Sequence, residues 1–208
     1  RRHRGAAPPE RHLLTGRTSA QRILTEVLER PATLGEGRLL CLDGPSGSGK
    51  TTLAREVSRL ALVGGVGCRV LHMDAMYDGW DGLPAVHTQL ATLLPPLAEG
   101  RPGRYRVYDW RVGRYRRTVE VPPVPLLVLE GVGSGHPAYD AVSTLLVWLE
   151  APLPLRRERA LARDREDFAP HWDAWAASEG TVLARDRTPE RADLVVDGAS
   201  GEVSPAGR

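Results

Sequence analysis

The stretch CLDGPSGSGKTT, residues 41–52, contains the pattern that decides the fold. Residues 44–51 match G-x-x-x-x-G-K-[ST], in which a glycine-rich turn joins a strand to a helix. The apolar run RLLCLD at residues 38–43 precedes the turn and predicts a buried strand. Apolar residues then recur at helical spacing, so we expect a helix over residues 50–63. The stretch therefore predicts a phosphate-binding loop between a strand and a helix.

The chemistry of this loop favours a bound phosphate chain. Its glycines let backbone N–H groups turn inward, and the following helix presents the positive end of its dipole to the same point. Lys50 is the only lysine among 28 lysine and arginine residues, and its compact ammonium suits a narrow loop better than a planar guanidinium does. Thr51 would place a hydroxyl on Mg²⁺, so we expect ATP or GTP with Mg²⁺. The predicted phosphate-binding residues are Gly44, Pro45, Ser46, Gly47, Ser48, Gly49, Lys50, Thr51 and Thr52.

Apolar strands alternate with helical segments along the rest of the chain. Further strands are expected at residues 68–73, 125–131, 143–150 and 192–198, and helices at 20–30 (capped by Ser19), 85–99 and 155–167. This alternation predicts an α/β fold of the P-loop NTPase type. We expect a three-layer sandwich, in which a five-stranded parallel sheet has helices on both faces.

One domain over residues 18–200 accounts for this pattern. Disordered tails are expected at residues 1–17, which are basic and aperiodic, and at residues 201–208. Residues 101–122 are expected to form a small inserted β-hairpin on the acceptor side. Residues 155–180 are expected to form a lid region that begins with an arginine-rich helix.

Composition and charge narrow the class of protein. Hydrophobic residues make up 41% of the 208 residues and charged residues 26%, so a sizeable core is available. The formal net charge of +2 is too balanced to indicate a surface that binds duplex nucleic acid. Cys41 and Cys68 lie in apolar runs and are interpreted as buried free thiols, and no apolar run approaches the ~18 residues of a membrane span. We therefore expect a cytoplasmic protein without a membrane partner.

A phosphate-binding loop indicates a nucleotide site without specifying a reaction. A Ras-like GTPase needs an Asn-Lys-x-Asp guanine reader, but this chain contains no asparagine. The LSGGQ-like signature of ABC-type ATPases is also missing, and AAA+ and helicase modules are generally longer. These exclusions leave a kinase of a small molecule or a nucleotide.

Three acids come at the ends of predicted strands. Asp74 follows the run at residues 68–73, and Glu130 follows residues 126–129. In an open parallel sheet the carboxyl ends of the strands lie beside the phosphate loop, so both acids are expected there. Phosphoryl transfer to a hydroxyl needs carboxylates that hold Mg²⁺ and that orient or deprotonate the acceptor. Asp43 also ends a strand, and for this acid a role in shaping the turn and a functional role both stay open.

Arginines gather after the fourth predicted strand. Arg156, Arg159 and Arg163 are spaced i, i+3 and i+7, so on a helix they share one face. Guanidinium groups on one face suit a lid that closes over a triphosphate and excludes water. The alternative is a solvated helix whose arginines pair with neighbouring acids.

These motifs together resemble the uridine kinase branch of P-loop kinases, which also includes pantothenate kinase and phosphoribulokinase. The agreement runs over residues 39–197. GPSGSGKT is similar to the G-x-S-G-S-G-K-[TS] loop of uridine kinases, and MDAMY at residues 73–77 to their Asp with a following Tyr. VYDW at residues 107–110 is similar to their Tyr-Asp-Phe, and LRRERALARD at residues 155–164 to their arginine pattern.

The resemblance implies a role for each matched position. Asp74 would be the general base or the acid that orients the acceptor, and Glu130 would be an outer Mg²⁺ ligand. The implied catalytic residues are Lys50, Asp74, Arg159 and Arg163, with Arg156 beside the nucleotide. The implied metal-site residues are Thr51, Asp74 and Glu130. The residues expected to face a small-molecule acceptor are Tyr77, Asp81, Tyr108 and Trp110.

The chain departs from the family pattern on the acceptor side. Uridine kinases have a base-reading His a few residues after Tyr-Asp-Phe, and its counterpart here is Gly113. The Gly-Arg that follows their lid arginines is replaced by REDFAPHW at residues 165–172. Four tryptophans have no clear counterpart, and core packing is the alternative role for each: Trp80, Trp110, Trp172 and Trp175. The acceptor therefore stays open between a nucleoside, a pantothenate-like chain and another metabolite.

Two further functions compete with a kinase. A regulatory ATPase would use the loop as a switch without an acceptor, although the inserted hairpin argues against it. The segment at residues 101–117 interleaves arginines with aromatic residues, which is a pattern of proteins that bind single-stranded nucleic acid. The sequence leaves a homo-oligomer open.

Overall fold

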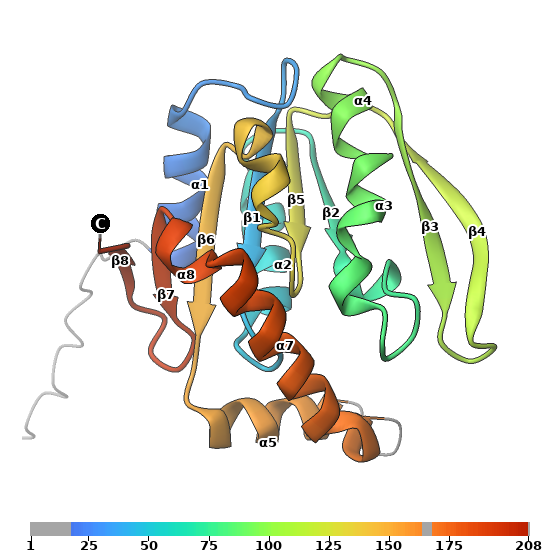
Figure 1. The fold of residues 1–208 in the computed structure, drawn as a ribbon. Coiled ribbons are helices and arrows are strands. Elements are labelled where there is room, and N and C mark those ends of the chain that lie inside the picture. Colours follow the sequence, from blue (N-terminus) through green and yellow to red (C-terminus); the bar gives the residue numbers. More distant parts are fainter. Residues whose placement is uncertain (1–17, 164–167, 208) are drawn as a thin grey trace, which may run out of the picture.

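The computed structural model describes residues 18–163 and 168–207, and the predicted tail at residues 1–17 lies outside this range. Figure 1 shows a central sheet with helices on both sides. Within the described residues this sheet has six strands, in the order β2 (Cys68–His72), β5 (Leu126–Glu130), β1 (Arg38–Asp43), β6 (Leu145–Glu150), β7 (Leu194–Asp197) and β8 (Val203–Pro205). The first five strands in this order are parallel, which confirms the predicted parallel sheet.

The sixth strand corrects the prediction of a tail at residues 201–208. β8 pairs antiparallel with β7, and Val203, opposite Val196, is buried. Helix α1 (Ser19–Glu29) also holds this segment, since Ser19 Oγ donates to the carbonyl of Gly201 and Arg22 to that of Val203, both at 2.7 Å. The segment has little apolar periodicity, so its order comes from backbone pairing with elements that are distant in the sequence.

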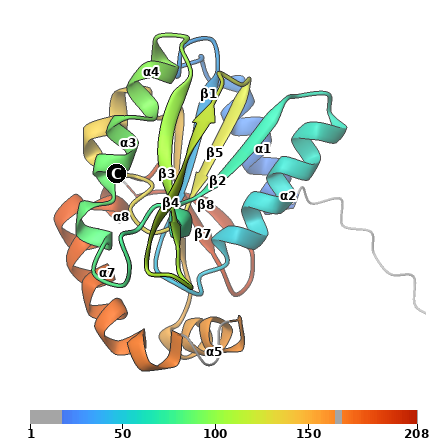
Figure 2. The ribbon, with the colours of Figure 1, turned by 90° about the vertical axis from the view of Figure 1, so that its right-hand side faces the viewer.

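Helices cover both faces of the sheet, as Figure 2 shows. α1 and α2 (Lys50–Val63) lie on one face, and their apolar sides pack on β1 and β5. α3 (His87–Ala91), α4 (Leu94–Ala98) and α7 (Trp172–Asp186) lie on the other. β1 is buried from Leu39 to Asp43 because it lies in the middle of the sheet with both faces covered.

Two predicted helix boundaries differ from the structure. Thr18, and not Ser19, caps α1. The Thr18 hydroxyl accepts the Gln21 N–H, and the Gln21 side-chain oxygen accepts the Thr18 N–H, so the two residues form a capping box. The helix expected at residues 85–99 is interrupted, so that a 3₁₀ turn at Leu83–Ala85 comes before α3 and α4. Pro95 and Pro96 lack the N–H groups that would continue α3, and they lie in the first turn of α4, which begins at Leu94.

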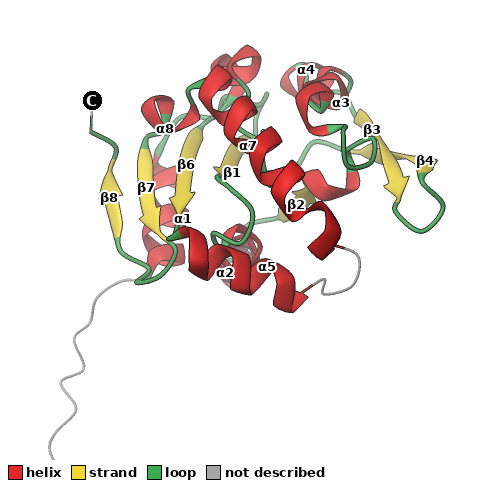
Figure 3. Ribbon diagram, turned by 60° about the horizontal axis from the view of Figure 1, so that its bottom comes forward, coloured by secondary structure: helices red, strands yellow, loops and turns green. Residues whose placement is uncertain are grey.

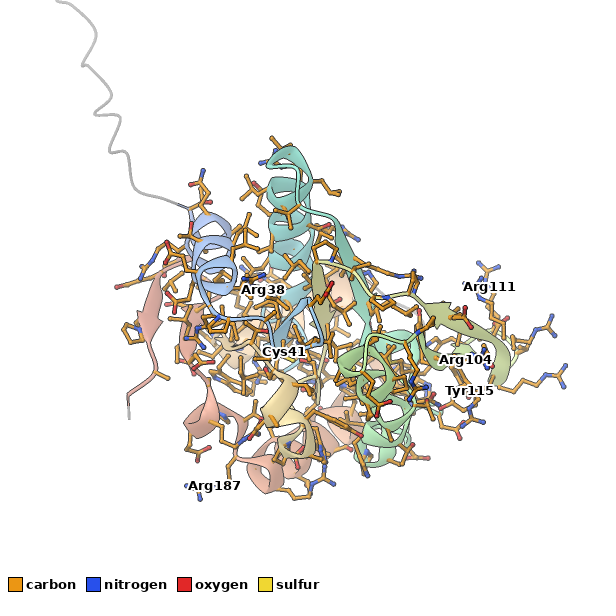
Figure 4. The ribbon with its side chains drawn as sticks, turned by 90° about the horizontal axis from the view of Figure 1, so that it is seen from above. Arg38, Cys41, Arg104, Arg111, Tyr115 and Arg187 are labelled. Carbon is orange, nitrogen blue, oxygen red and sulfur yellow. The ribbon has the colours of Figure 1, made fainter. Side chains whose placement is uncertain are left out.

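The predicted hairpin forms a separate two-stranded sheet. β3 (Gly103–Asp109) pairs antiparallel with β4 (Arg114–Val121), within the range of residues 101–122. Figure 4 shows Arg104, Arg111 and Tyr115 on this hairpin, well away from Arg38 and Cys41 in the central sheet. The hairpin therefore forms a projecting edge of the molecule.

The predicted lid region lies at the carboxyl ends of the parallel strands. α5 (Leu153–Arg163) follows β6 and lies beyond the strand ends, and Figure 3 brings this end of the molecule forward. A 3₁₀ turn at Ala169–His171 leads into α7, and α8 (Thr188–Arg191) then leads to β7. Residues 164–167 and the side chain of Arg163 lie outside the described part. None of the described helices has both the length and the apolar character needed to cross a membrane.

Candidate active site

The phosphate loop runs from the end of β1 to the start of α2 in a conformation that requires its glycines. Gly44 has φ +142°, and a Cβ there would lie 2.1 Å from the carbonyl oxygen of Leu149. Gly47 has φ +78°, and its Cβ would lie 2.2 Å from the carbonyl oxygen of Arg156. Any side chain at either position would push the loop away from β6 or α5.

Lys50 lies inside the loop that its backbone helps to form. Its ammonium donates to the carbonyl oxygens of Gly44 at 2.6 Å and of Pro45 at 2.9 Å. Burial lowers the pKa of Lys50, while the carboxylates of Glu179 and Glu130 act in the opposite direction. The one lysine of the chain therefore places its charge inside the phosphate cradle, as predicted.

A cavity of about 620 Å³, the loop cavity, opens in front of this cradle. Of the predicted phosphate-binding residues, those at 46–52 line it, whereas Gly44 and Pro45 only hold Lys50. Asp74, Glu130 and Arg159 also line the loop cavity. The structure thus brings residues from four predicted segments to one place.

Glu130 and Thr51, two of the predicted metal-site residues, lie together on the wall of the loop cavity. Thr51 Oγ1 donates to Glu130 Oε1 at 3.0 Å, and His72 Nδ1 lies 2.5 Å from the same oxygen. Burial raises the pKa of Glu130, but the hydrogen bond from His72 and the charge of Lys50 outweigh it, so the net pKa is lowered. The hydrogen bond to Glu130 in turn raises the pKa of His72. Glu130 is therefore held as a carboxylate, and His72 is a member of the site that the motifs did not indicate.

The donor set on this wall fits Mg²⁺. A hydroxyl and a carboxylate are hard oxygen ligands, and Mg²⁺ is usually held by one or two carboxylates together with water and substrate phosphates. Within the described residues, no group of three or more His, Cys, Asp or Glu could hold a metal ion. Thr51 and Glu130 thus suit an ion that arrives with its nucleotide.

Asp74 stands where two cavities meet. It lies just beyond β2 in a 3₁₀ turn at Met73–Ala75, and its backbone carbonyl accepts a hydrogen bond from Trp110 Nε1 at 3.0 Å. Its side chain is exposed and lines both the loop cavity and a second cavity on the hairpin side. This position is the one that the strand pattern predicted.

Asp43 has a structural role. It is fully buried, and its carboxylate accepts backbone N–H groups of Gly44 at 2.7 Å, Gly133 at 3.0 Å and Gly135 at 2.9 Å. Burial raises its pKa to about 6, while these hydrogen bonds act in the opposite direction. Asp43 therefore ties the phosphate loop to the segment after β5 and lines neither cavity.

The two described lid arginines point to different places. Arg159 lines the loop cavity and donates to the carbonyl of Gly198 at 2.9 Å. Arg156 instead donates to the carbonyl of Ala151 at 3.1 Å and lies behind the loop, 4.0 Å from Glu179. The predicted shared face of the helix therefore does not bring Arg156 into the loop cavity. The side chain of Arg163 lies outside the described part.

Glu179 is a buried support of the loop that the sequence reasoning missed. Its carboxylate accepts the N–H of Ser46 at 2.9 Å, the Ser46 hydroxyl, and Trp175 Nε1 at 2.6 Å. Trp175 also lies 3.0 Å from Ser46 Oγ. In the sequence, the only indication of this role is the i, i+4 spacing of Trp175 and Glu179, which places the two residues on one face of α7. This helix therefore connects the phosphate loop to the second cavity, which Trp175 lines.

The second cavity, the aromatic cavity, has a volume of about 600 Å³. Three of the predicted acceptor-facing residues line it: Tyr77, Tyr108 and Trp110. Asp81 does not, because its side chain is exposed outside the cavity. The remaining wall includes residues that were not predicted for this role: Arg55, His72, Trp80, Phe168 and Trp175. Trp172 packs in the hydrophobic core, which is the alternative role that the sequence left open for it.

Comparison with solved structures identifies the fold. A structure from Bacillus stearothermophilus described as a possible uridine kinase matches with a TM-score of 0.63 at 22% identity, over 86% of this chain and 97% of that chain. A structure from Silicibacter sp. TM1040 described as a "putative fructose transport system kinase" matches with a TM-score of 0.58 at 24% identity, over 85% and 96%. No protein-family model matches the chain, and no curated protein matches it significantly. The chain therefore has the P-loop kinase fold that the sequence predicted.

Proposed function

We propose that this chain is an ATP-dependent phosphotransferase that moves the γ-phosphate to a hydroxyl group of a small molecule. One observation carries the proposal: the loop cavity and the aromatic cavity share Thr51, Asp74 and Glu130. A nucleotide in the first cavity and an acceptor in the second would meet at these side chains. A switch that only binds nucleotide has no use for a second cavity at that point.

The transfer would proceed in line between the two cavities. The acceptor oxygen forms a bond to the γ-phosphorus while the bond to the bridging oxygen breaks, and ADP leaves with that electron pair. The proton of the acceptor hydroxyl goes to the Asp74 carboxylate and then to solvent. Lys50 and Arg159, on the wall of the loop cavity, offset the charge on the phosphates.

Thr51 and Glu130 would hold Mg²⁺ beside the phosphates in this reaction. Bound Mg²⁺ would neutralise charge that develops between the β- and γ-phosphates. Glu130 suits this role because it is buried and ionised, and because Thr51 and His72 fix its orientation. His72 is therefore a positioning residue for the carboxylate.

The test is single-turnover transfer from γ-labelled ATP in the presence of Mg²⁺. The acceptor panel includes uridine and fructose, which the two similar structures suggest, together with pantothenate and an amino sugar. We expect at least one acceptor to be phosphorylated, with little hydrolysis when none is present, because a kinase excludes water. ATP binding without transfer to any acceptor would overturn the proposal, as would ATP hydrolysis that is equally fast without one.

A further inference from the structure

Aromatic side chains are concentrated at the acceptor side to an unusual degree. The whole chain has five Trp, five Tyr and one Phe. Six of these line the aromatic cavity: Tyr77, Trp80, Tyr108, Trp110, Phe168 and Trp175. Ligand cavities are mostly apolar with a few placed polar groups, and here the apolar part consists almost entirely of rings.

The rings form one connected cluster around Trp80. Its ring centroid lies 4.8 Å from that of Trp110, 5.5 Å from that of Phe168 and 6.0 Å from that of Trp175. Trp110 also contacts Tyr108 edge to face at 5.2 Å. These contacts join the loop after β2, the hairpin and the α7 region, so the rings form a wall that is already assembled without a ligand.

Most polar atoms on these rings are already engaged within the protein. The Tyr77 hydroxyl donates to the carbonyl of Val132 at 2.9 Å, and Trp110 Nε1 to that of Asp74. Trp175 Nε1 donates to Glu179. Among the described residues, hydrogen bonds leave uncommitted only the Tyr108 hydroxyl and the Trp80 N–H of this cluster.

The hairpin turn after Trp110 adds no polar side chain to the aromatic cavity, since residues 111–113 do not line it. Gly113 has φ +65°, and a Cβ at this position would point toward the Tyr108 hydroxyl at 3.8 Å. A pyrimidine base carries two carbonyl oxygens and one N–H along its hydrogen-bonding edge. The other polar side chains of this cavity lie mainly on the wall that it shares with the loop cavity: Ser46, Thr51, Arg55, Asp74 and Glu130. His72 also lines the cavity and is bonded to Glu130. On the ring side, the two uncommitted groups cannot match all three atoms of a pyrimidine edge, and a buried polar atom without a partner reduces affinity. The cavity is therefore better matched to a ring with few polar atoms.

We propose that the acceptor is an alcohol with an aromatic or apolar ring that bears at most two polar atoms besides the reacting hydroxyl, and not a nucleoside. This inference rests on the proposed phosphotransferase function, since the hydroxyl must reach Asp74. The ring lies against Trp80 and Trp110, and the chain that bears the hydroxyl extends toward the shared wall of the two cavities.

Acceptor preference tests the inference directly. The probes are benzyl alcohol, 2-phenylethanol and 3-phenylpropanol, compared with uridine and cytidine in the same assay with ATP and Mg²⁺. We expect kcat/KM for the best ring alcohol to exceed that for either nucleoside by about tenfold or more, which corresponds to one unmatched polar group. Equal or faster transfer to a nucleoside would overturn the inference and leave the phosphotransferase intact. Transfer to no compound, fructose and pantothenate included, would overturn both.

A binding measurement and a variant pair separate this inference from a structural role of the rings. Titration with 2-phenylethanol should change tryptophan fluorescence saturably, because three tryptophans line the cavity, and uridine should not. Trp110→Leu should raise KM for 2-phenylethanol about tenfold, whereas Trp110→Phe, which keeps a ring, should raise it much less. Val112→Ala, an exposed change in the same turn, is the control. Equal effects of Leu and Phe at Trp110 on KM would contradict a ring contact.

Discussion

The phosphate loop is one continuous stretch at residues 44–51, whereas the aromatic cavity draws its rings from the loop after β2, from the hairpin, from Phe168 and from α7. Buried polar groups fix the loop, with Asp43 below it, Glu179 beside it and Lys50 inside it. Ring contacts around Trp80, at centroid distances from 4.2 Å (His171) to 6.0 Å (Trp175), hold the wall of the cavity.

Because of this difference, the two regions are not equally free to change the ligand that they bind. Hydrogen bonds to backbone groups demand one geometry, so the loop suits the one task proposed for it, the binding of a phosphate chain. Rings packed on one another tolerate several ligand shapes, so the aromatic cavity can change its acceptor without any change in the loop.

Asp74 lies in both cavities, and its substitution is expected to have the largest effect. Asp74→Asn should lower the single-turnover transfer rate by ~10²–10⁴, because an amide cannot take up the acceptor proton. ATP affinity should change little. Asp81→Asn, an exposed acid that lines neither cavity, is the matched control. A full transfer rate in Asp74→Asn would remove the assignment of the base.

Lys50 belongs to the loop alone. Lys50→Met should lower transfer by ~10²–10³ with every acceptor, because the charge inside the cradle is lost. The loss should therefore be the same for ring alcohols, sugars and nucleosides. Arg59→Met removes an exposed cation farther along α2 and should leave the rate unchanged. A loss confined to one acceptor would show that the two regions are not independent.

Glu179 links the regions through α7. Glu179→Ala leaves the Ser46 N–H buried without its acceptor and leaves the Trp175 N–H only the Ser46 hydroxyl, so we expect an ATP KM about tenfold higher and a lower Tm. Glu179→Gln keeps one oxygen that can accept and should lie close to the wild type. A change in acceptor KM without a change in ATP KM would place Glu179 in the aromatic cavity alone.

Tyr77 lines the aromatic cavity, but its hydroxyl points into the protein. Tyr77→Phe leaves the Val132 carbonyl without its donor, and the free energy of unfolding should fall by ~1–2 kcal/mol. The ring stays against Trp175 at 5.1 Å, so acceptor KM should not change. Denaturant unfolding and steady-state kinetics on one preparation measure both quantities. A large rise in KM would instead make this hydroxyl an acceptor contact.

Most of the candidate site around the phosphate loop could be predicted from the sequence. Lys50 and Thr51 belong to one motif, and Asp74 and Glu130 follow strands whose carboxyl ends must share an edge in a parallel sheet. The five parallel strands followed from the same alternation of apolar runs. These predictions succeeded because each depends on neighbours within a few residues or on a rule of sheet topology.

The failures share a physical cause. The spacing of Arg156 and Arg159 gives a helix face, but it does not say which side of the loop that face meets. The sequence did not indicate β8, because its own residues are weakly apolar and the strand is formed by its pairing with β7. The resemblance to uridine kinases implied that Asp81 faces the acceptor, but this residue does not line the aromatic cavity.

The amino-acid sequence was enough to establish the phosphate cradle, the sheet and the two acids, since their chemistry depends on contiguous residues and on strand order. The tertiary structure was needed to place Glu179 against Ser46 and to gather six rings into one wall. Such contacts join residues that are far apart in the chain, and the packing that brings them together depends on all the elements between them. That is why the proposed reaction class already follows from the sequence, while the proposal for the acceptor required the assembled cavity.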